Sequence, residues 1–313
     1  MPDIILHHYP ESPFSEKARL MLGYRNLAWR SVTIPIMMPK PDLTALTGGY
    51  RRTPVMQIGN DIYCDTALIA DVLERMAPES SLLPKGTEGR ARAIGQWADS
   101  TLFMTAVAYF YQAAGMERLL ASMTPEQIQA SQQDRAALLG NRALPGLAEV
   151  SASLLVCMQA FQEMLQDGRQ FLLGDVATLA DVCCYHPLWF IQAAPPSAAM
   201  FRATPLVAAW MDRVKRVGHG RPSELSATDA LSVARNCAPA AIESPPSDIP
   251  GIALGDEVEV MPSDYGLDPV RGELVLVEAN HVAVRRRDER AGTVVVHFPR
   301  IGFQVRKAGA AAG

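Results

Sequence analysis

The chain has 313 residues, which is longer than one average domain, so its length predicts two or three domains. Hydrophobic residues make up 49% and charged residues 20%, as in an ordinary globular protein. The formal net charge of −4 disfavours a nucleic-acid-binding protein, which usually carries a basic excess. Five scattered cysteines without a CxxC pair predict neither a disulfide framework nor a zinc site, so we expect no metal centre.

Two features bear on a membrane or secreted location. The N-terminus lacks the basic start and long apolar core of a signal peptide. The uncharged stretch 182–201 is about as long as a membrane span, but Pro187, Pro195 and Pro196 interrupt it. We therefore expect a buried helix followed by a loop, no membrane contact, and a cytoplasmic, reduced protein.

The first eighty residues alternate between strand and helix signals. Ser12 is placed to cap a helix that begins at Pro13. The turn Gly59-Asn60-Asp61 joins two short strands into a hairpin. In chain order the predicted elements are strand 4–8, helix from 13, strand 29–34, helix 42–47, strands 54–58 and 62–64, and helix 65–76. This order fits a thioredoxin-like domain, which we place at residues 1–83.

The following segment, residues 88–237, consists almost entirely of helix-forming residues. Thr124-Pro125 has the form of a helix start, with a hydroxyl cap and a proline at the first position. Thr178-Leu179-Ala180-Asp181 has the spacing of a capping box. Segments 206–217 and 226–237 are two further amphipathic helices. These signals predict an all-helical second domain.

A proline-rich linker, residues 243–251, precedes five short β-branched segments. They predict a third domain at residues 250–308, a small closed or nearly closed barrel of SH3-like type, and so an α+β multidomain chain. Arg285-Arg286-Arg287 suggests nucleic acid, but residues 249–313 hold eight Lys or Arg against nine Asp or Glu. We expect the barrel to pack on the helical domain or to bind a protein partner.

One short motif draws attention to the first helix. Ser12-Pro13-Phe14-Ser15 keeps the frame of the redox motif Cys-Pro-Phe-Cys but carries a hydroxyl where each thiol would stand. Together with Thr53-Pro54-Val55 before a strand, Asp65-Thr66 at a helix start and the segment 178–181, it resembles the glutathione S-transferase family. The resemblance covers roughly residues 3–237 and does not extend to the C-terminal barrel.

The resemblance implies that glutathione is a cosubstrate bound at one edge of the first domain. The backbone of Thr53 or Val55 would hold its cysteinyl part beside a cis Pro54, while Asp65 would meet the γ-glutamyl ammonium and Thr66 the α-carboxylate. Helix N-termini supply unpaired N–H groups and a positive dipole end for such anions. The alternative for Asp65 and Thr66 is a helix cap alone.

Ser12 is the candidate catalytic residue. A serine cannot attack a disulfide as a cysteine does, but it can donate a hydrogen bond to the thiolate of glutathione. Lowering a thiol pKa of about 8.5 by two units needs only about 2.7 kcal/mol, which one charge-assisted hydrogen bond and a helix N-terminus can supply. The alternatives are that Ser12 only caps its helix, or that Tyr9 provides the hydroxyl.

The second substrate and the overall activity follow from the same resemblance. An electrophilic small molecule would bind between the domains, along the first long helix of the second domain, although aromatic residues at helical spacing are more typical of a core. They are Trp97, Phe103, Tyr109, Phe110 and Tyr111. Lys40, Arg51 or Arg52 could meet the glycyl carboxylate of glutathione, or simply be exposed cations.

Two functions remain open. The first is a glutathione transferase, with a homodimer as a possible assembly. The second is a non-catalytic relative that acts as a binding or scaffold protein through its barrel, since a fold does not determine a function.

Overall fold

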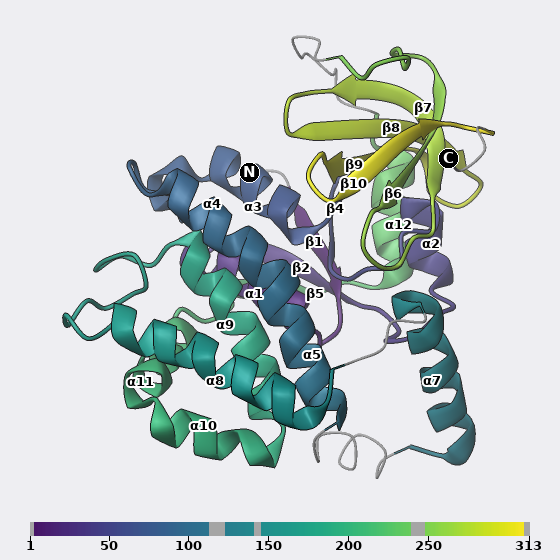
Figure 1. Cartoon of the computed structure of the whole chain (residues 1–313). Coiled ribbons are helices and arrows are strands. Elements are labelled where there is room, and N and C mark those ends of the chain that lie inside the picture. Colours follow the sequence, from purple (N-terminus) through teal and green to yellow (C-terminus); the bar gives the residue numbers. More distant parts are fainter. Residues whose placement is uncertain (1–2, 113–122, 141–144, 239–247, 310–313) are drawn as a thin grey trace.

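The computed structural model describes residues 3–112, 123–140, 145–238 and 248–309. Its first part has the predicted thioredoxin-like order (Figure 1). The elements are β1 (Ile4–His8), α1 (Pro13–Tyr24), β2 (Ala28–Thr33), α2 (Pro41–Thr47), β3 (Val55–Ile58), β4 (Asp61–Cys64) and α3 (Thr66–Met76).

Local sequence signals account for these boundaries. Ser12 caps α1, because its Oγ accepts a hydrogen bond from the Ser15 N–H at 3.1 Å. Gly48 ends α2 in the left-handed conformation, with φ of 80°. The Thr53–Pro54 peptide bond is cis, as predicted.

The second part is helical, as predicted. Its main elements are α4 (Glu88–Trp97), a π-helical segment η2 (Ala98–Leu102), α5 (Phe103–Gln112), α7 (Pro125–Leu139), α8 (Leu147–Met164), α9 (Leu179–Gln192), α10 (Ala198–Ala203), α11 (Pro205–Lys215) and α12 (Ala227–Asn236). The capping box of Thr178 and Asp181 is confirmed, and Asp181 also accepts a hydrogen bond from the Trp210 indole at 2.9 Å. Within the described ranges no helix is long and apolar enough to cross a membrane.

In the described part of the chain, ten strands form one sheet, in the order β10-β6-β7-β8-β9-β4-β3-β1-β2-β5. The C-terminal β-rich region is confirmed. Its strands are β6 (Glu257–Pro262), β7 (Val270–Val277), β8 (His281–Asp288), β9 (Gly292–Pro299) and β10 (Phe303–Lys307), and β10 returns to pair with β6. Residues 243–247 of the predicted linker lie outside the described residues.

The attachment of this region to the first domain was not predicted. We expected the region to pack on the helical domain or to bind a protein partner; in the structure, β9 pairs in parallel with β4, with Ile62 opposite Val296. The edge of the first domain's sheet is thereby continued by the C-terminal strands. At the opposite edge, β5 (Arg221–Glu224) pairs in parallel with β2. This strand inside the predicted helical segment was missed because all four of its residues are exposed and none is strongly apolar.

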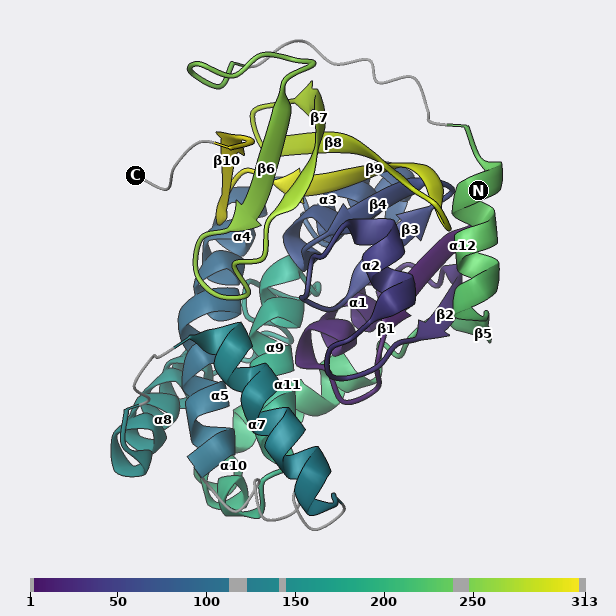
Figure 2. The same cartoon turned by 90° about the vertical axis from the view of Figure 1, so that its right-hand side faces the viewer.

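The sheet separates two hydrophobic cores. One core joins a face of the sheet to α1, α3 and the helical bundle. The other joins the opposite face to α2 and α12, which lie side by side (Figure 2), and it continues into the C-terminal strands. Val55, Ile62, Val260 and Phe298 are all fully buried in this second core. The C-terminal region therefore shares its core with the first domain.

Candidate functional site

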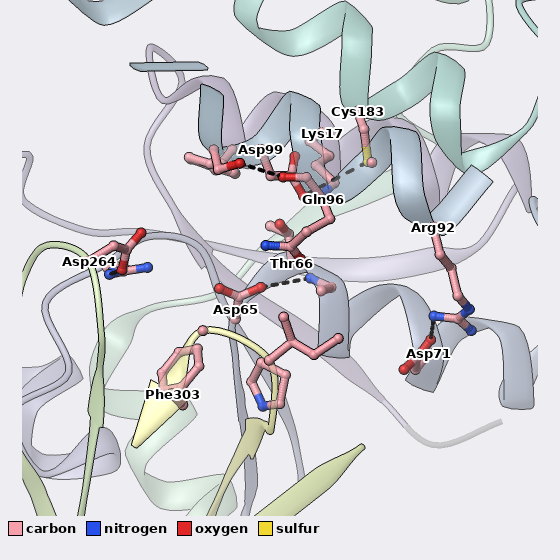
Figure 3. A pocket seen from close by; sticks show the side chains of 18 of the residues that line it. Lys17, Asp65, Thr66, Asp71, Arg92, Gln96, Asp99, Cys183, Asp264 and Phe303 are labelled. Carbon is pink, nitrogen blue, oxygen red and sulfur yellow. Dashed lines mark hydrogen bonds and ion pairs between the residues drawn. The ribbon is translucent and has the colours of Figure 1, made fainter. Parts of the chain in front are cut away.

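The first domain, the start of the helical domain and the C-terminal strands enclose one cavity of about 610 Å³ (Figure 3). Its volume lies within the range usual for small-molecule sites. Four of the predicted glutathione-binding residues line it together: Thr53, Pro54, Asp65 and Thr66. The fifth, Val55, is fully buried at the start of β3.

Asp65 both caps a helix and faces the cavity. Its Oδ1 accepts a hydrogen bond from the Ala67 N–H at 2.8 Å, which explains the start of α3. Its backbone has φ of 76° and ψ of 137°. A residue other than glycine with positive φ is costly, by about 1–3 kcal/mol, and such residues cluster at ligand sites. Burial raises the pKa of Asp65, as expected for a carboxyl group deep in a cavity.

The two candidate hydroxyls lie beside the cavity rather than in its lining. Ser12 is only 3% exposed, and its Oγ is engaged as the cap of α1. A hydroxyl that accepts one hydrogen bond still has its own proton to donate. Burial raises the pKa of Tyr9 to about 12, so its phenol stays protonated at neutral pH. Phe14, in the first turn of α1, does line the cavity.

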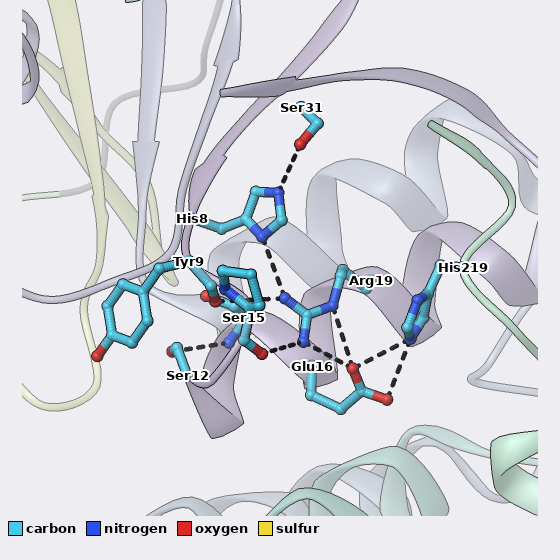
Figure 4. Close-up of polar contacts among 9 residues, drawn as sticks. His8, Tyr9, Ser12, Ser15, Glu16, Arg19, Ser31 and His219 are labelled. Atoms are coloured by element: carbon cyan, nitrogen blue, oxygen red, sulfur yellow. Dashed lines mark hydrogen bonds and ion pairs between the residues drawn. The ribbon is translucent and has the colours of Figure 1, made fainter. Parts of the chain in front are cut away.

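A polar network, buried except at His219, holds the start of α1 (Figure 4). Arg19 donates to Glu16 at 2.8 Å and lies 3.1 Å from Nδ1 of His8. His219, from the segment after α11, lies 3.0 Å from the same Glu16 carboxylate. Burial lowers the pKa of His8 to about 4, so its imidazole is neutral and accepts the hydrogen bond from Arg19. Among the described residues, no group of three or more His, Cys, Asp or Glu could hold a metal ion.

The floor of the cavity holds a charged cluster that the sequence did not reveal. Lys17 on α1 forms an ion pair with Asp99 on η2, and its side chain is only 1% exposed. His186 on α9 lies 3.0 Å from the other oxygen of Asp99. Burial opposes the charge of Lys17, but the Asp99 carboxylate raises its pKa above the usual value. Burial also raises the pKa of Cys183, beside this cluster, to about 12, so its thiol is unreactive.

Lys40, Arg51 and Arg52, the candidates for contact with the glycyl carboxylate of glutathione, all have partners within the protein. The alternative interpretation, that they are simply exposed cations, is therefore wrong. Lys40 donates to Thr53 Oγ1 at 3.2 Å, and burial lowers its pKa to about 8. Arg51 pairs with Asp134 of α7 at 2.6 Å. Arg52 pairs with Asp264, which lies in the loop between β6 and β7 of the C-terminal region. These contacts tie the loop before Pro54 to distant parts of the chain.

The aromatic residues of the first long helix lie mainly in the core, in agreement with the more typical role of such a stripe. Phe103, Tyr109 and Phe110 are each at most 9% exposed. The polar side chains that line the cavity from this part of the chain, among them Gln96 and Ser100, belong to α4 and the π-helical segment η2.

These features define the class of protein. The family model of the glutathione S-transferase N-terminal domain matches residues 6–81, and that of the C-terminal domain matches residues 120–216. A glutathione S-transferase-like protein from Pseudomonas syringae, of known structure, is 40% identical, with a TM-score of 0.80 over 98% of this chain and 100% of that one. The chain belongs to the glutathione S-transferase family.

Two more distant relatives match a smaller part of the chain, one by its structure and the other by its sequence. A glutathione S-transferase from Rhodospirillum rubrum shares the fold at 21% identity, with a TM-score of 0.51 over 68% of this chain and 87% of that one. FtsZ-localized protein A of Caulobacter vibrioides is 29% identical over 138 residues, or 42% of this chain. The matched part spans 60% of the length of that relative.

Proposed function

We propose that the protein is a glutathione-dependent transferase that directs the sulfur of glutathione to an electrophilic carbon of a small molecule. The observation that supports it is the meeting of Thr53, Pro54, Asp65 and Thr66 around one cavity of about 610 Å³. Thr53 and Pro54 directly precede β3, whereas Asp65 and Thr66 lie at the start of α3, and the match of the family model to residues 6–81 covers all four. Asp65 would bind the γ-glutamyl ammonium and Thr66 the α-carboxylate.

The cysteinyl part would run along Thr53 and Val55 by backbone pairing, as an added strand does. The pyrrolidine ring of Pro54 leaves one backbone donor fewer to satisfy there. This placement directs the thiol towards the start of α1, where the helix dipole favours a negative charge. Ser12 would then donate its hydroxyl proton to the thiolate while Oγ continues to accept from Ser15.

The proposed reaction has two parts. The thiol first loses its proton to solvent base, which the lowered pKa allows at neutral pH. The sulfur lone pair then forms a bond to the electrophilic carbon, and the leaving group departs with the bonding electrons. Ser12 stabilises the thiolate and forms no covalent bond.

Two measurements test this proposal. Calorimetry should show glutathione binding to the wild type, and an aryl halide such as chlorodinitrobenzene should be turned over. Ser12→Ala should retain glutathione but lose at least about ten-fold in turnover, the scale of a missing charge-assisted hydrogen bond. The pKa of the bound thiol, read from the ultraviolet thiolate band, should rise towards its free value.

The chain provides a matched control for Ser12→Ala. Ser226 caps α12 through the same contact, accepting from the Asp229 N–H at 3.0 Å, far from the cavity lining. Both alanine variants should lose about 1 kcal/mol of stability from the missing cap. Only Ser12→Ala should lose turnover. Equal activity in the two variants would assign Ser12 to capping alone, and loss of turnover in Tyr9→Phe would move the role to Tyr9.

A second candidate is a non-catalytic binding protein. Neither Ser12 nor Tyr9 is among the residues that line the cavity, which favours this candidate. The name of the Caulobacter relative adds a possible partner, FtsZ. Co-sedimentation with assembled FtsZ, together with binding of glutathione but no turnover of any electrophile, would support this function over the enzyme.

A further inference from the structure

The C-terminal region contacts the first domain along residues 41–54, a segment that ends at the proposed glutathione site. The segment contains α2, which lies beside the C-terminal strands (Figures 1 and 2), the turn at Gly48 and Gly49, and the loop that leads to Thr53 and Pro54. Neither matched family model covers the C-terminal strands, so their role does not follow from the family. The contacts of the segment indicate that role.

Arg286 on β8 binds the C-terminal end of α2. Its Nη1 donates to the carbonyl of Ala45 at 2.5 Å and to that of Leu46 at 3.5 Å. The last carbonyls of a helix have no partner within the helix, and a cation there also complements the negative end of the helix dipole. The Arg286 side chain is only 16% exposed, and a Cβ at Gly48 would lie 2.7 Å from its Nε. Glycine at position 48 therefore allows the arginine to approach the end of the helix.

α2 needs this support because it is short. It has seven residues, and its N-cap, Lys40, makes no side-chain hydrogen bond to it. A helix of this length is not stable by itself in water. Arg290, in the turn between β8 and β9, forms an ion pair with Asp42 in the first turn of α2. Both ends of α2 are thus bound to the hairpin of β8 and β9.

The rest of the segment follows the C-terminal region as far as the cavity. Tyr50 is 4% exposed, and the centre of its ring lies 6.0 Å from that of Phe298 on β9. The guanidinium carbon of Arg52 lies 3.8 Å from the centre of the Tyr265 ring, in the loop between β6 and β7. Tyr50, Arg52 and Tyr265 all line the cavity. The C-terminal region therefore holds the chain up to the residue before Thr53.

We infer that the C-terminal region positions residues 41–54 so that the backbone at Thr53 has the conformation that pairs with glutathione, and that Arg286 is a positioning residue in this role. This inference rests on the proposed function and adds what orders its site. A loop that is already ordered loses less conformational entropy when a peptide pairs with it, so its order increases affinity. Arg286 does not line the cavity, so it acts on glutathione only through α2 and the loop.

Arg286→Met tests the inference, and the neighbouring arginine provides the control. Arg285 lies on the same strand, but its side chain is 45% exposed and pairs with Glu273 of β7. In calorimetry, Arg286→Met should bind glutathione at least about ten-fold more weakly than the wild type or Arg285→Met, the scale of one lost charge-assisted hydrogen bond. At saturating glutathione, turnover of chlorodinitrobenzene should stay within about two-fold of the wild type, so that KM for glutathione rises while kcat does not fall.

Amide hydrogen exchange locates the effect in the chain. The amides of residues 45–53 should exchange faster in Arg286→Met than in Arg285→Met, and saturating glutathione should slow them again. Unchanged affinity in Arg286→Met, or weaker affinity without faster exchange of these amides, would overturn the inference while glutathione binding by the wild type still supported the proposed function.

Arg286→Lys replaces Arg286→Met if the methionine variant does not fold. Lysine keeps the positive charge but not the planar guanidinium, so the same two effects should appear at a smaller size, about three-fold in affinity. Wild-type affinity and wild-type exchange in Arg286→Lys would then overturn the inference. If the wild type does not bind glutathione, the proposed function fails and the inference fails with it.

Discussion

Replacing Lys17 by methionine removes the cation at the floor of the cavity while keeping most of the side-chain volume. The Asp99 carboxylate then lacks its ion-pair partner and retains His186 at 3.0 Å. Breaking a buried ion pair by removing one partner costs about 3–5 kcal/mol. Because the Asp99 side chain is 19% exposed, we expect the loss in the free energy of unfolding to lie at the lower end of this range, at about 3 kcal/mol.

Urea denaturation measures this change, and a second substitution identifies its cause. Lys17→Met combined with Asp99→Asn removes the unpaired charge, so the double variant should be more stable than Lys17→Met alone. Lys307→Met is the control, because the Lys307–Asp256 pair, at 3.1 Å, is largely exposed and should contribute less than about 1 kcal/mol.

The penalty should also depend on pH through His186. Burial lowers the pKa of His186, and the Lys17 charge lowers it further. A histidine with a lowered pKa in the folded state costs stability as pH falls below its ordinary value of about 6.5. Without Lys17, His186 can take a proton and pair with Asp99, so the penalty should be smaller at pH 5.5 than at pH 8. A penalty below 1 kcal/mol, or one that Asp99→Asn does not relieve, would refute the reasoning.

Three other predictions concern the site and the first strand. Asp65→Ala should weaken glutathione binding by about 1–3 kcal/mol in calorimetry. Thr124→Ala, which removes the cap of α7, should bind glutathione normally. If Asp65→Ala lowers the stability of the protein but leaves its affinity for glutathione unchanged, Asp65 is a helix cap only. Ser12→Cys should form a mixed disulfide with oxidised glutathione and release one molecule of reduced glutathione, because a helix N-terminus activates a thiol. If mass spectrometry shows no adduct, residue 12 does not lie beside bound glutathione. Burial lowers the pKa of both His7 and His8 to about 4, so the unfolded chain binds more protons between pH 6.5 and 4. The melting temperature should therefore fall across this window, and the fall should be smaller in His7→Asn.

The spacing of residues in the sequence predicted those features of the fold that depend on residues close together in the chain. The Ser12 cap and the capping box at Thr178 are confirmed, because each depends on residues within a few positions of one another. The cis bond before Pro54, which the family resemblance implied, is also confirmed. The pairing of β4 with β9 was not predictable in this way. A four-residue strand has the same pattern whether its outer edge is open or paired, so the partner of 61–64 is not encoded nearby.

The candidate site shows the same difference between features set by nearby residues and contacts between distant segments. Asp65, Thr66 and Thr53 were found through their motifs, and the structure brings them to one cavity. Lys17 was missed because a lysine on an amphipathic helix usually lies on the solvated face. Its partner Asp99 is 82 residues further along, and nothing in the spacing links the two. Tyr265 was missed because the family resemblance ends before the C-terminal region.

The pairing of β4 with β9 also has a consequence for synthesis on the ribosome. Asp61 and its hydrogen-bond partner His297 are 236 residues apart in the chain. At the usual rate of about 5–20 residues per second, roughly 10–50 s pass between the emergence of the two strands. During that time the nascent first domain presents the unpaired edge of β4, and an exposed strand edge is where neighbouring chains associate. A nascent chain that stalls or is cut in the linker would keep this edge open, so the last sixty residues protect the first eighty from aggregation.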